Sequence, residues 1–181
     1  MDKKELRAEI RRRKKEHSAE ELGAMSAEVM NTLEDSDFFL KANTVLLYYS
    51  LPDEVSTHAF VEKWKTSKKI LLPVVCGDIL HLRVYDGNAS LYTGAFNIEE
   101  PQGNEFTDFA DIDLAVIPGM AFDRDGHRLG RGKGFYDKLL PGIKCRKIGL
   151  CFSFQLADSV PIEPHDIVMD MVLTDDGFAK L

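Results

Sequence analysis

The residues best suited to chemistry lie in the run LAVIPGMAFDRDGHRLGRGKGFYD, at positions 114–137. Three glycines alternate there with two cations, and a third cation lies just upstream: Gly130, Gly132, Gly134, Arg131, Lys133 and Arg128. Glycine lets backbone N–H groups approach a ligand closely, and cations supply the charge that a polyanionic phosphate requires. An apolar strand precedes this loop, and a helix follows whose dipole points to the same place. The pattern predicts a phosphate site, with a solvated flexible loop as the alternative.

The named glycine motifs do not describe this loop. A Walker A loop requires Ser or Thr after its lysine, whereas Gly134 follows Lys133 and His127 stands where the first glycine should be. The dinucleotide fingerprint also fails, because neither Gly130 nor Gly132 has a third glycine at the required spacing. The glycine and charge pattern alone is therefore only a moderately specific indication of a phosphate site.

The run PGMAFDRDGHRLGRGKGFYD closely resembles the signature of the 5-formyltetrahydrofolate cyclo-ligases, also called methenyltetrahydrofolate synthetases. Three further segments resemble this family in the same order: KKELRAEIRRR, YYSLPDEVST and VPIEPHDIVMD. The long signature is highly specific, and the four segments span nearly the whole chain. The resemblance implies an ATP- and Mg²⁺-dependent cyclisation of 5-formyltetrahydrofolate to 5,10-methenyltetrahydrofolate, with release of ADP and phosphate through phosphorylation of the formyl oxygen.

The same resemblance implies roles for individual residues, with Arg131 and Lys133 as the catalytic cations. It implies that these residues contact ATP: Lys3, Lys4, Arg7, Arg128, Gly130, Arg131, Gly132, Lys133, Gly134, Phe135 and Tyr136. It implies that these contact the folate: Tyr49, Glu54, Arg131, Gly132, Lys133, Gly134 and Phe135. Asp137 and Asp166 match the carboxylates that bind Mg²⁺, and only folding can bring them together across 29 positions of sequence.

Several of these residues have a structural alternative. Asp137 lies in a first helical turn, where it would stabilise the helix dipole. Tyr49 suits an apolar core equally well, and a glutamate just past a turn, such as Glu54, is usually a surface residue. Lys3 and Arg7 share one helical face, which would also suit a solvated helix.

Two neighbouring features are expected to be structural. We expect a structural rather than a catalytic role for His165. The run DRDG at positions 123–126 has its glycine at the wrong position for a calcium loop and predicts a tight turn. Phe135 stands where many members of the similar family have tyrosine, so this chain has no hydroxyl group at that position.

Charge is distributed unevenly along the chain. Residues 1–15 contain eight basic and three acidic side chains, a net charge of +5, and the remaining 15 basic and 27 acidic side chains give the rest −12. A basic arm on an acidic body raises nucleic acid as a partner. The body would repel a phosphate backbone, so we expect small-molecule partners, ATP and the folate, and no nucleic acid.

Length and composition indicate the number of domains and the cellular compartment. A chain of 181 residues has the length of one domain, and we expect a single cyclo-ligase-like domain over residues 1–181 that acts as a monomer. Three cysteines without CxxC spacing indicate reduced thiols in the cytoplasm. No apolar run approaches the ~20 residues that cross a bilayer, and the charged N-terminus is unlike a signal peptide.

The elements that must position the candidate residues alternate between strands and helices. Apolar runs predict strands at positions 45–49, 69–75, 79–85 (near an edge), 114–117, 147–152 and 171–174 (the last strand). Helical patterns cover positions 1–15 and the stretches after the capping residues Ser18 and Thr57 and from Phe135. Positions 87–103 are turn-rich, with an extended loop at 97–101.

This alternation predicts a three-layer α/β/α fold with a mainly parallel central sheet and a helical N-terminal arm. In such sheets ligands bind beyond the carboxyl ends of the strands, where the candidate segments lie. Two rivals remain because a fold does not fix a function. One is a phosphosugar isomerase or acyl-CoA-transferase-like enzyme, which would form no ADP. The other is a non-catalytic nucleotide-binding domain or nucleic-acid binder, which would show strongly salt-dependent binding through the basic arm and no turnover.

Overall fold

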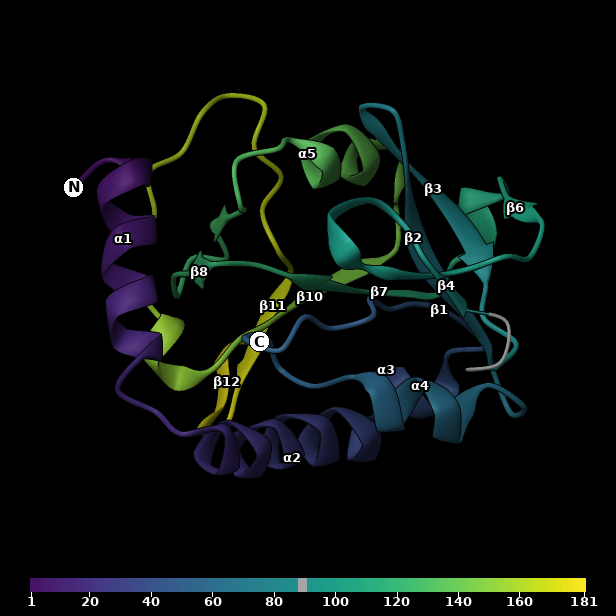
Figure 1. Cartoon of the computed structure of the whole chain (residues 1–181), viewed down its shortest axis with the longest axis horizontal. Helices are drawn as coiled ribbons and strands as arrows, with labels where there is room; N and C mark the ends of the chain where they lie inside the picture. The colour runs from purple at the N-terminus through teal and green to yellow at the C-terminus, as the bar shows by residue number, and fades with distance from the viewer. Residues whose placement is uncertain (88–90) are drawn as a thin grey trace.

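A large sheet runs through the molecule in a computed structural model that describes residues 1–87 and 91–181 (Figure 1). Its strands are β1 (Thr44–Leu46), β2 (Lys69–Cys76), β3 (Ile79–Val84), β6 (Glu105–Phe106), β7 (Leu114–Pro118), β10 (Arg146–Leu150), β11 (Met171–Thr174) and β12 (Gly177–Lys180). They form one eight-stranded sheet in the order β12-β11-β10-β7-β1-β2-β3-β6.

The five central strands, from β11 to β2, are parallel. Antiparallel strands flank them, β12 on one side and β3 with β6 on the other. The central strands are continuous apolar runs because both faces of a parallel sheet are covered. In β1, Val45 packs into the core on one face and Leu46 into the core on the other, and both are fully buried.

Helices cover both faces of the sheet. They are α1 (Lys3–Lys14), α2 (Ala19–Asp35), α3 (Asp37–Lys41), α4 (His58–Trp64) and α5 (Phe135–Leu139). Figure 1 places α2, α3 and α4 below the sheet and α5 above it, and the two hydrophobic cores contain residues of these respective helices. The three-layer α/β/α fold with a mainly parallel sheet is therefore confirmed.

The N-terminal arm is a helix packed against the body. Asp2 and Glu5 form a capping box at the start of α1, and Leu6 and Ile10 are buried in a small core with Met120. Because these two apolar residues recur at i, i+4, one face of α1 is held down while its cations remain available on other faces.

Several local predictions need correction. The strand expected at 45–49 ends at Leu46. Thr57 occupies the N-cap position of α4 but makes no cap hydrogen bond; its hydroxyl donates to the Tyr48 carbonyl and accepts from the Ser50 N–H. The strand β11 is not the last, because β12 follows it in a hairpin whose residues show no strong apolar alternation.

The turn-rich stretch also contains regular structure. Positions 88–90 lie outside the described residues, but β4 (Leu91–Thr93) pairs with β5 (Glu99–Pro101), where an extended loop was predicted. A second hairpin joins β8 (Ala121–Phe122) to β9 (Arg128–Leu129). Short 3₁₀ turns occupy Ala95–Asn97, Phe109–Asp111, Leu140–Gly142 and Ser153–Gln155. Within the described ranges, no helix has the length and apolar character needed to cross a membrane.

Candidate functional site

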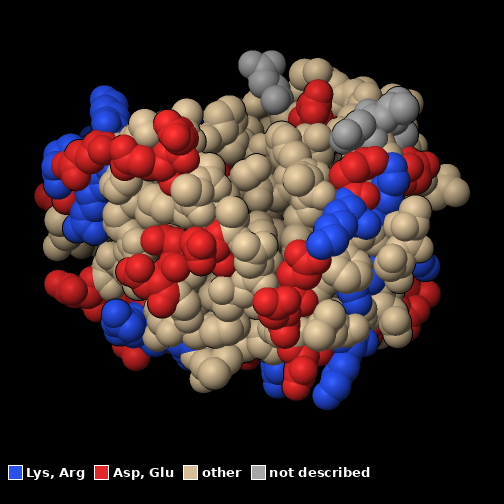
Figure 2. Space-filling model, turned by 90° about the horizontal axis from the view of Figure 1, so that it is seen from below, with Lys and Arg blue, Asp and Glu red and all other residues tan. Residues whose placement is uncertain are grey.

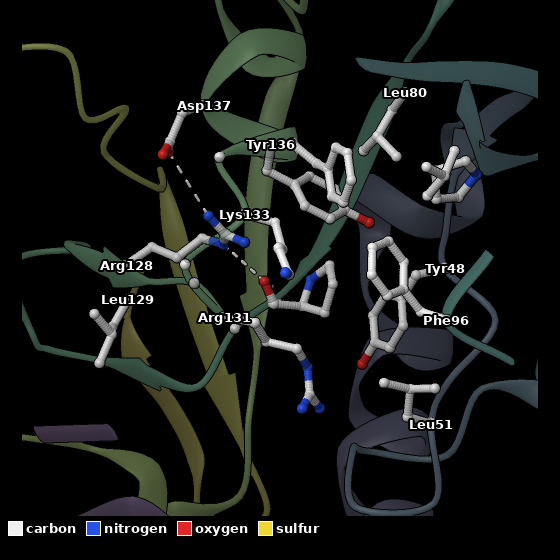
Figure 3. A pocket seen from close by; sticks show the side chains of 18 of the residues that line it. Tyr48, Leu51, Leu80, Phe96, Arg128, Leu129, Arg131, Lys133, Tyr136 and Asp137 are labelled. Carbon is white, nitrogen blue, oxygen red and sulfur yellow. Dashed lines mark hydrogen bonds and ion pairs between the residues drawn. The ribbon is translucent and has the colours of Figure 1, made fainter. Parts of the chain in front are cut away.

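A cleft of about 320 Å³ lies beyond the carboxyl ends of the parallel strands, where α/β sheets bind ligands (Figure 3). Its lining comes from segments far apart in sequence: α1, the 48–54 segment after β1, the β4–β5 hairpin, the loop from β9 to α5, and positions 163–166. Only the tertiary fold brings these segments together.

The glycine loop forms one wall of the cleft between β9 and α5. Gly132 and Gly134 have φ values of 98° and 73°, which side-chain-bearing residues rarely adopt. Arg7 of α1 donates from Nε to the Gly130 carbonyl at 2.8 Å, so the arm fixes the loop from outside. The predicted helix after the loop is present, but α5 has only five residues, so charge on side chains matters more here than a helix dipole.

Arg128 is the buried cation of the site. Its side chain is 9% exposed, and its Nε donates to the Pro118 carbonyl at 2.7 Å, at the end of β7. Its guanidinium lies 4.9 Å from the centre of the Tyr136 ring and 4.0 Å from the Asp137 carboxylate. Burial lowers the pKa of Arg128 from its usual value, but an arginine remains charged. These contacts fix a positive charge at the base of the cleft.

Arg131 spans from the glycine loop to the opposite wall. Its Nη2 lies 2.9 Å from Asp53 and 3.2 Å from Glu54, and Asp53 also pairs with Lys14 of α1 at 3.0 Å. Burial raises the pKa of Glu54, whose side chain is only 12% exposed. Asp53 and Lys14 were not identified from the sequence; the position of Asp53, beside Glu54 in the same turn, was the available signal.

Aromatic side chains form the apolar part of the cleft. Phe96, at the tip of the β4–β5 hairpin, is 57% exposed and has a φ of 58°, rare for a non-glycine residue. The Lys133 ammonium lies 5.4 Å from the centre of the Phe96 ring, and Phe135 packs against the same ring edge-on at 6.0 Å. Phe96 was also missed, because no pattern in the sequence distinguishes it from other loop aromatics. Desolvation by burial raises the pKa of Tyr136, so its phenol stays protonated.

A group of metal-binding type lies at the other end of the cleft. One ligand atom each of Asp137, His165 and Asp166 can be chosen so that all lie within 4.8 Å of one another. Octahedral Mg²⁺ with ~2.1 Å bonds places opposite ligands about 4.2 Å apart, so a small adjustment would let both carboxylates bind one ion. Lys3 already lies 3.2 Å from Asp166 and 2.8 Å from Glu163. The donor set therefore fits Mg²⁺, with a cation of the protein beside it.

His165 lies at the exposed edge of this group. Its side chain is 63% exposed, and its Nε2 lies 3.6 Å from both the Asp166 and the Glu163 carboxylates. The expectation of a structural rather than a catalytic role for His165 stays a prediction.

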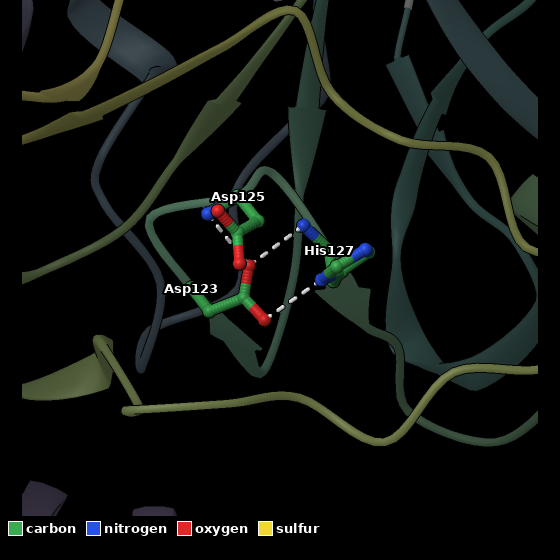
Figure 4. Close-up of side chains that lie close together, drawn as sticks. All are labelled: Asp123, Asp125 and His127. Atoms are coloured by element: carbon green, nitrogen blue, oxygen red, sulfur yellow. Dashed lines mark hydrogen bonds and ion pairs between the residues drawn. The ribbon is translucent and has the colours of Figure 1, made fainter.

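A second acidic group, at positions 123–127, has a structural explanation (Figure 4). The Asp123 carboxylate accepts hydrogen bonds from the backbone N–H groups of Asp125, His127 and Val160 and from the His127 ring, all between 2.9 and 3.0 Å. The Gly126 N–H donates to the Asp123 carbonyl at 3.1 Å, which confirms the predicted tight turn. Each of the two oxygens accepts two hydrogen bonds, so this carboxylate stabilises the turn.

The cleft contains nearly all the residues that the sequence singled out. Every predicted contact and metal residue lines it except Lys4, an exposed residue of α1. Tyr49 lines the cleft and stacks on His58 with the ring centres 3.7 Å apart. Fold and site together define an open, mainly parallel α/β protein with a cleft that combines clustered cations, aromatic walls and paired carboxylates.

Comparison with known proteins identifies the family. Residues 1–175 match the model of the 5-formyltetrahydrofolate cyclo-ligase family. The chain is 30% identical to a mouse 5-formyltetrahydrofolate cyclo-ligase, over 98% of this chain and 96% of that one. Its fold is similar to that of the Aquifex aeolicus 5,10-methenyltetrahydrofolate synthetase, with a TM-score of 0.89, 35% identity and coverage of 98% and 92%. The fold is also similar to that of a Mycoplasma pneumoniae 5,10-methenyltetrahydrofolate synthetase, with a TM-score of 0.76 and 26% identity. That match covers 97% of this chain and 99% of the other. The chain therefore belongs to the 5-formyltetrahydrofolate cyclo-ligase family of enzymes.

Proposed function

We propose that this protein uses Mg·ATP to cyclise 5-formyltetrahydrofolate to 5,10-methenyltetrahydrofolate, releasing ADP and phosphate. The observation that carries the proposal is the joint lining of one cleft by the cationic glycine loop and by Glu54. A phosphate donor held at the loop and a folate held at Glu54 would meet between these two walls. Family membership supports both substrates.

The chemistry proceeds in two steps. The formyl oxygen attacks the γ-phosphorus of ATP. The bond between the γ-phosphorus and the β–γ bridging oxygen breaks, and ADP leaves. N10 of the folate then attacks the activated formyl carbon, the carbon–oxygen bond breaks, phosphate departs and N10 loses its proton. Phosphorylation thus turns a poor leaving group into a good one, and the protein contributes position and charge.

The cations of the glycine loop would stabilise the migrating negative charge. Arg128 offers a fixed, buried charge, and Lys133 offers an ammonium beside the Phe96 ring in the cleft lining. Arg131 would bind phosphate with the guanidinium nitrogens that do not face the carboxylates. When bound, Mg²⁺ would neutralise phosphate oxygens, and Asp137 and Asp166 are the carboxylates suited to hold it.

Glu54 would anchor the pterin. A carboxylate can accept from an exocyclic amine and the neighbouring ring N–H as a fork. In a site where Glu54 is 12% exposed, these hydrogen bonds compete with little water, which strengthens them. Tyr49 and Phe135 would provide apolar contact beside the ring.

The proposal extends to the whole chain as a single domain that acts as a cytoplasmic monomer on small molecules. The family match over residues 1–175 supports one domain, and Lys3, Arg7 and Lys14 of the basic arm have partners within this chain. Figure 2 shows acidic and basic side chains interspersed on the face that α2, α3 and α4 cover, which would not attract a phosphate backbone.

The decisive experiment follows methenyltetrahydrofolate by its near-ultraviolet absorbance. Purified protein is incubated with 5-formyltetrahydrofolate, with and without Mg·ATP, and ADP is measured in parallel. We expect an absorbance rise that requires both ATP and Mg²⁺, with one ADP formed per product. A flat trace from folded protein that binds ATP would reject the proposed reaction.

A further inference from the structure

Glu54, the proposed pterin anchor, is already engaged in this structure. The Nη2 group of Arg131 lies 3.2 Å from its Oε1, and the guanidinium extends from the glycine loop toward the Leu51 side of the cleft (Figure 3). A pterin that binds Glu54 as a fork would use both carboxylate oxygens, so it would compete with Arg131 for Oε1. Folate binding therefore competes with an ion pair at a carboxylate that is 12% exposed, where charge interactions are poorly screened.

Asp53 provides the alternative partner for the same nitrogen. Its Oδ1 accepts from Arg131 Nη2 at 2.9 Å, and its Oδ2 accepts from the Lys14 ammonium at 3.0 Å. Lys14 is 9% exposed and belongs to α1, so Asp53 is fixed from behind by a buried cation. Burial would raise the pKa of Asp53, but the two cations outweigh it, the pKa lies below its usual value, and the group stays charged.

These four groups, two carboxylates and two cations, balance in charge. If Glu54 turns to a neutral pterin edge, Arg131 still has Asp53, and no buried charge is left without a partner. Within the described part of the chain, Nε and Nη1 of Arg131 have no hydrogen-bond partner, so they remain available to phosphate oxygens while Nη2 stays on Asp53.

We propose that Asp53 is a positioning residue that holds Arg131 so that Glu54 can exchange the guanidinium for the folate. This inference rests on the proposed function and adds to it a residue that acts through Arg131. Without the carboxylate of Asp53, Arg131 has Glu54 as its remaining anionic partner, and the folate has to compete for Glu54 against a stronger ion pair.

The test is equilibrium binding of 5-formyltetrahydrofolate without ATP, measured by isothermal titration calorimetry. We expect Asp53→Asn to weaken binding about fivefold, the upper end of what an ion pair between two side chains that are each 44% exposed contributes. In an Arg131→Gln background, the same Asp53→Asn change should alter Kd by less than twofold, because its effect passes through Arg131. A direct effect on the folate or on folding would persist in that background.

Two control variants separate positioning from stability. Lys14→Gln removes the buried support of Asp53 but leaves the Asp53–Arg131 pair, so it should weaken binding by less than Asp53→Asn does. Asp78→Asn removes the carboxylate that pairs with Lys138 at 2.9 Å, an exposed ion pair that does not line the cleft. The Kd of this variant should equal that of the wild type. Circular dichroism and a thermal melt check that each variant is folded.

The outcomes are distinct. A Kd for Asp53→Asn within twofold of the wild type, the same loss in the Arg131→Gln background, or an equal loss in Lys14→Gln would each overturn the role of Asp53. If the wild type forms methenyltetrahydrofolate in these cases, the proposed function stands alone. A folded wild type that neither binds nor converts 5-formyltetrahydrofolate would overturn both.

Discussion

Replacing Asp123 with asparagine tests how the tight turn at positions 123–127 stabilises the protein. Asparagine keeps an oxygen for the N–H groups of Asp125 and His127 at Oδ1, but it places an NH₂ group opposite the Val160 N–H at Oδ2. Asp123 is 1% exposed, so the Val160 donor loses its partner away from water. A buried unsatisfied donor costs about 1–3 kcal/mol, and weakening the remaining charge-assisted bonds adds about 1 kcal/mol. We expect a loss of about 2–4 kcal/mol in the free energy of unfolding.

Urea denaturation followed by circular dichroism measures this loss, provided that the m-value is unchanged between the two proteins. Asp125→Asn is the matched control, because Asp125 lies in the same turn but is exposed. Its effect should stay within about 0.5 kcal/mol, as for ordinary surface substitutions. A loss below about 1 kcal/mol for Asp123→Asn would refute the reasoning, since the four-donor site would then contribute no more than a typical single hydrogen bond.

The same carboxylate predicts a pH dependence. Burial opposes its charge, but the hydrogen bonds from Val160 and His127 outweigh burial and hold the pKa of Asp123 below its ordinary 3.8. A lowered folded-state pKa stabilises the protein fully above 3.8, and the contribution is lost as pH falls through the folded-state value. The difference in stability between wild type and Asp123→Asn should therefore shrink only below pH 4. A difference that shrank between pH 8 and pH 5 would contradict this sign.

Three further predictions concern activity. Lys133→Ala should lower kcat about 10²–10³-fold with an unchanged circular-dichroism spectrum, whereas Lys138→Ala, outside the cleft, should stay within twofold; equal rates would remove Lys133 from the reaction. Glu54→Gln should raise the KM for the folate at least tenfold and the KM for ATP less than twofold, and equal changes in both would place Glu54 elsewhere. Chelation by EDTA should abolish turnover and added Mg²⁺ restore it; a persistent rate would show that Asp137 and Asp166 hold no essential ion.

The sequence predicted the parts of the fold that depend on local pattern. Continuous apolar runs identified the parallel strands, and the Ser18 cap was located correctly, since its hydroxyl accepts from the Glu21 N–H. Strands β4, β5 and β12 were missed because they are short and partly exposed, so their sequences contain no long apolar or alternating pattern. The role of the Thr57 hydroxyl depends on a contact with Tyr48 nine positions earlier, which capping statistics do not encode.

The candidate site likewise contains residues that a local pattern predicts and residues that it does not. Arg131 and Lys133 stand out because glycine alternation and charge are visible within five residues. Asp53 and Phe96 do not, because their place in the cleft follows from pairings across 78 positions in one case and from a hairpin tip in the other. A local motif thus identifies the cations that we propose to contact phosphate, whereas the residues that we propose to orient them are brought to the site by tertiary structure.

The uneven charge of the chain now has a structural meaning. The arm carries +5 and the body −12, which alone would suit an extended arm bound to a polyanion. In the fold, Lys3 pairs with Asp166, Arg7 binds the Gly130 carbonyl and Lys14 pairs with Asp53. Each contact joins α1 to a different wall of the cleft. The charge asymmetry therefore works within the molecule: it holds the first helix against the site, so that changes in the arm should affect ligand binding before they affect solubility or contact with other molecules.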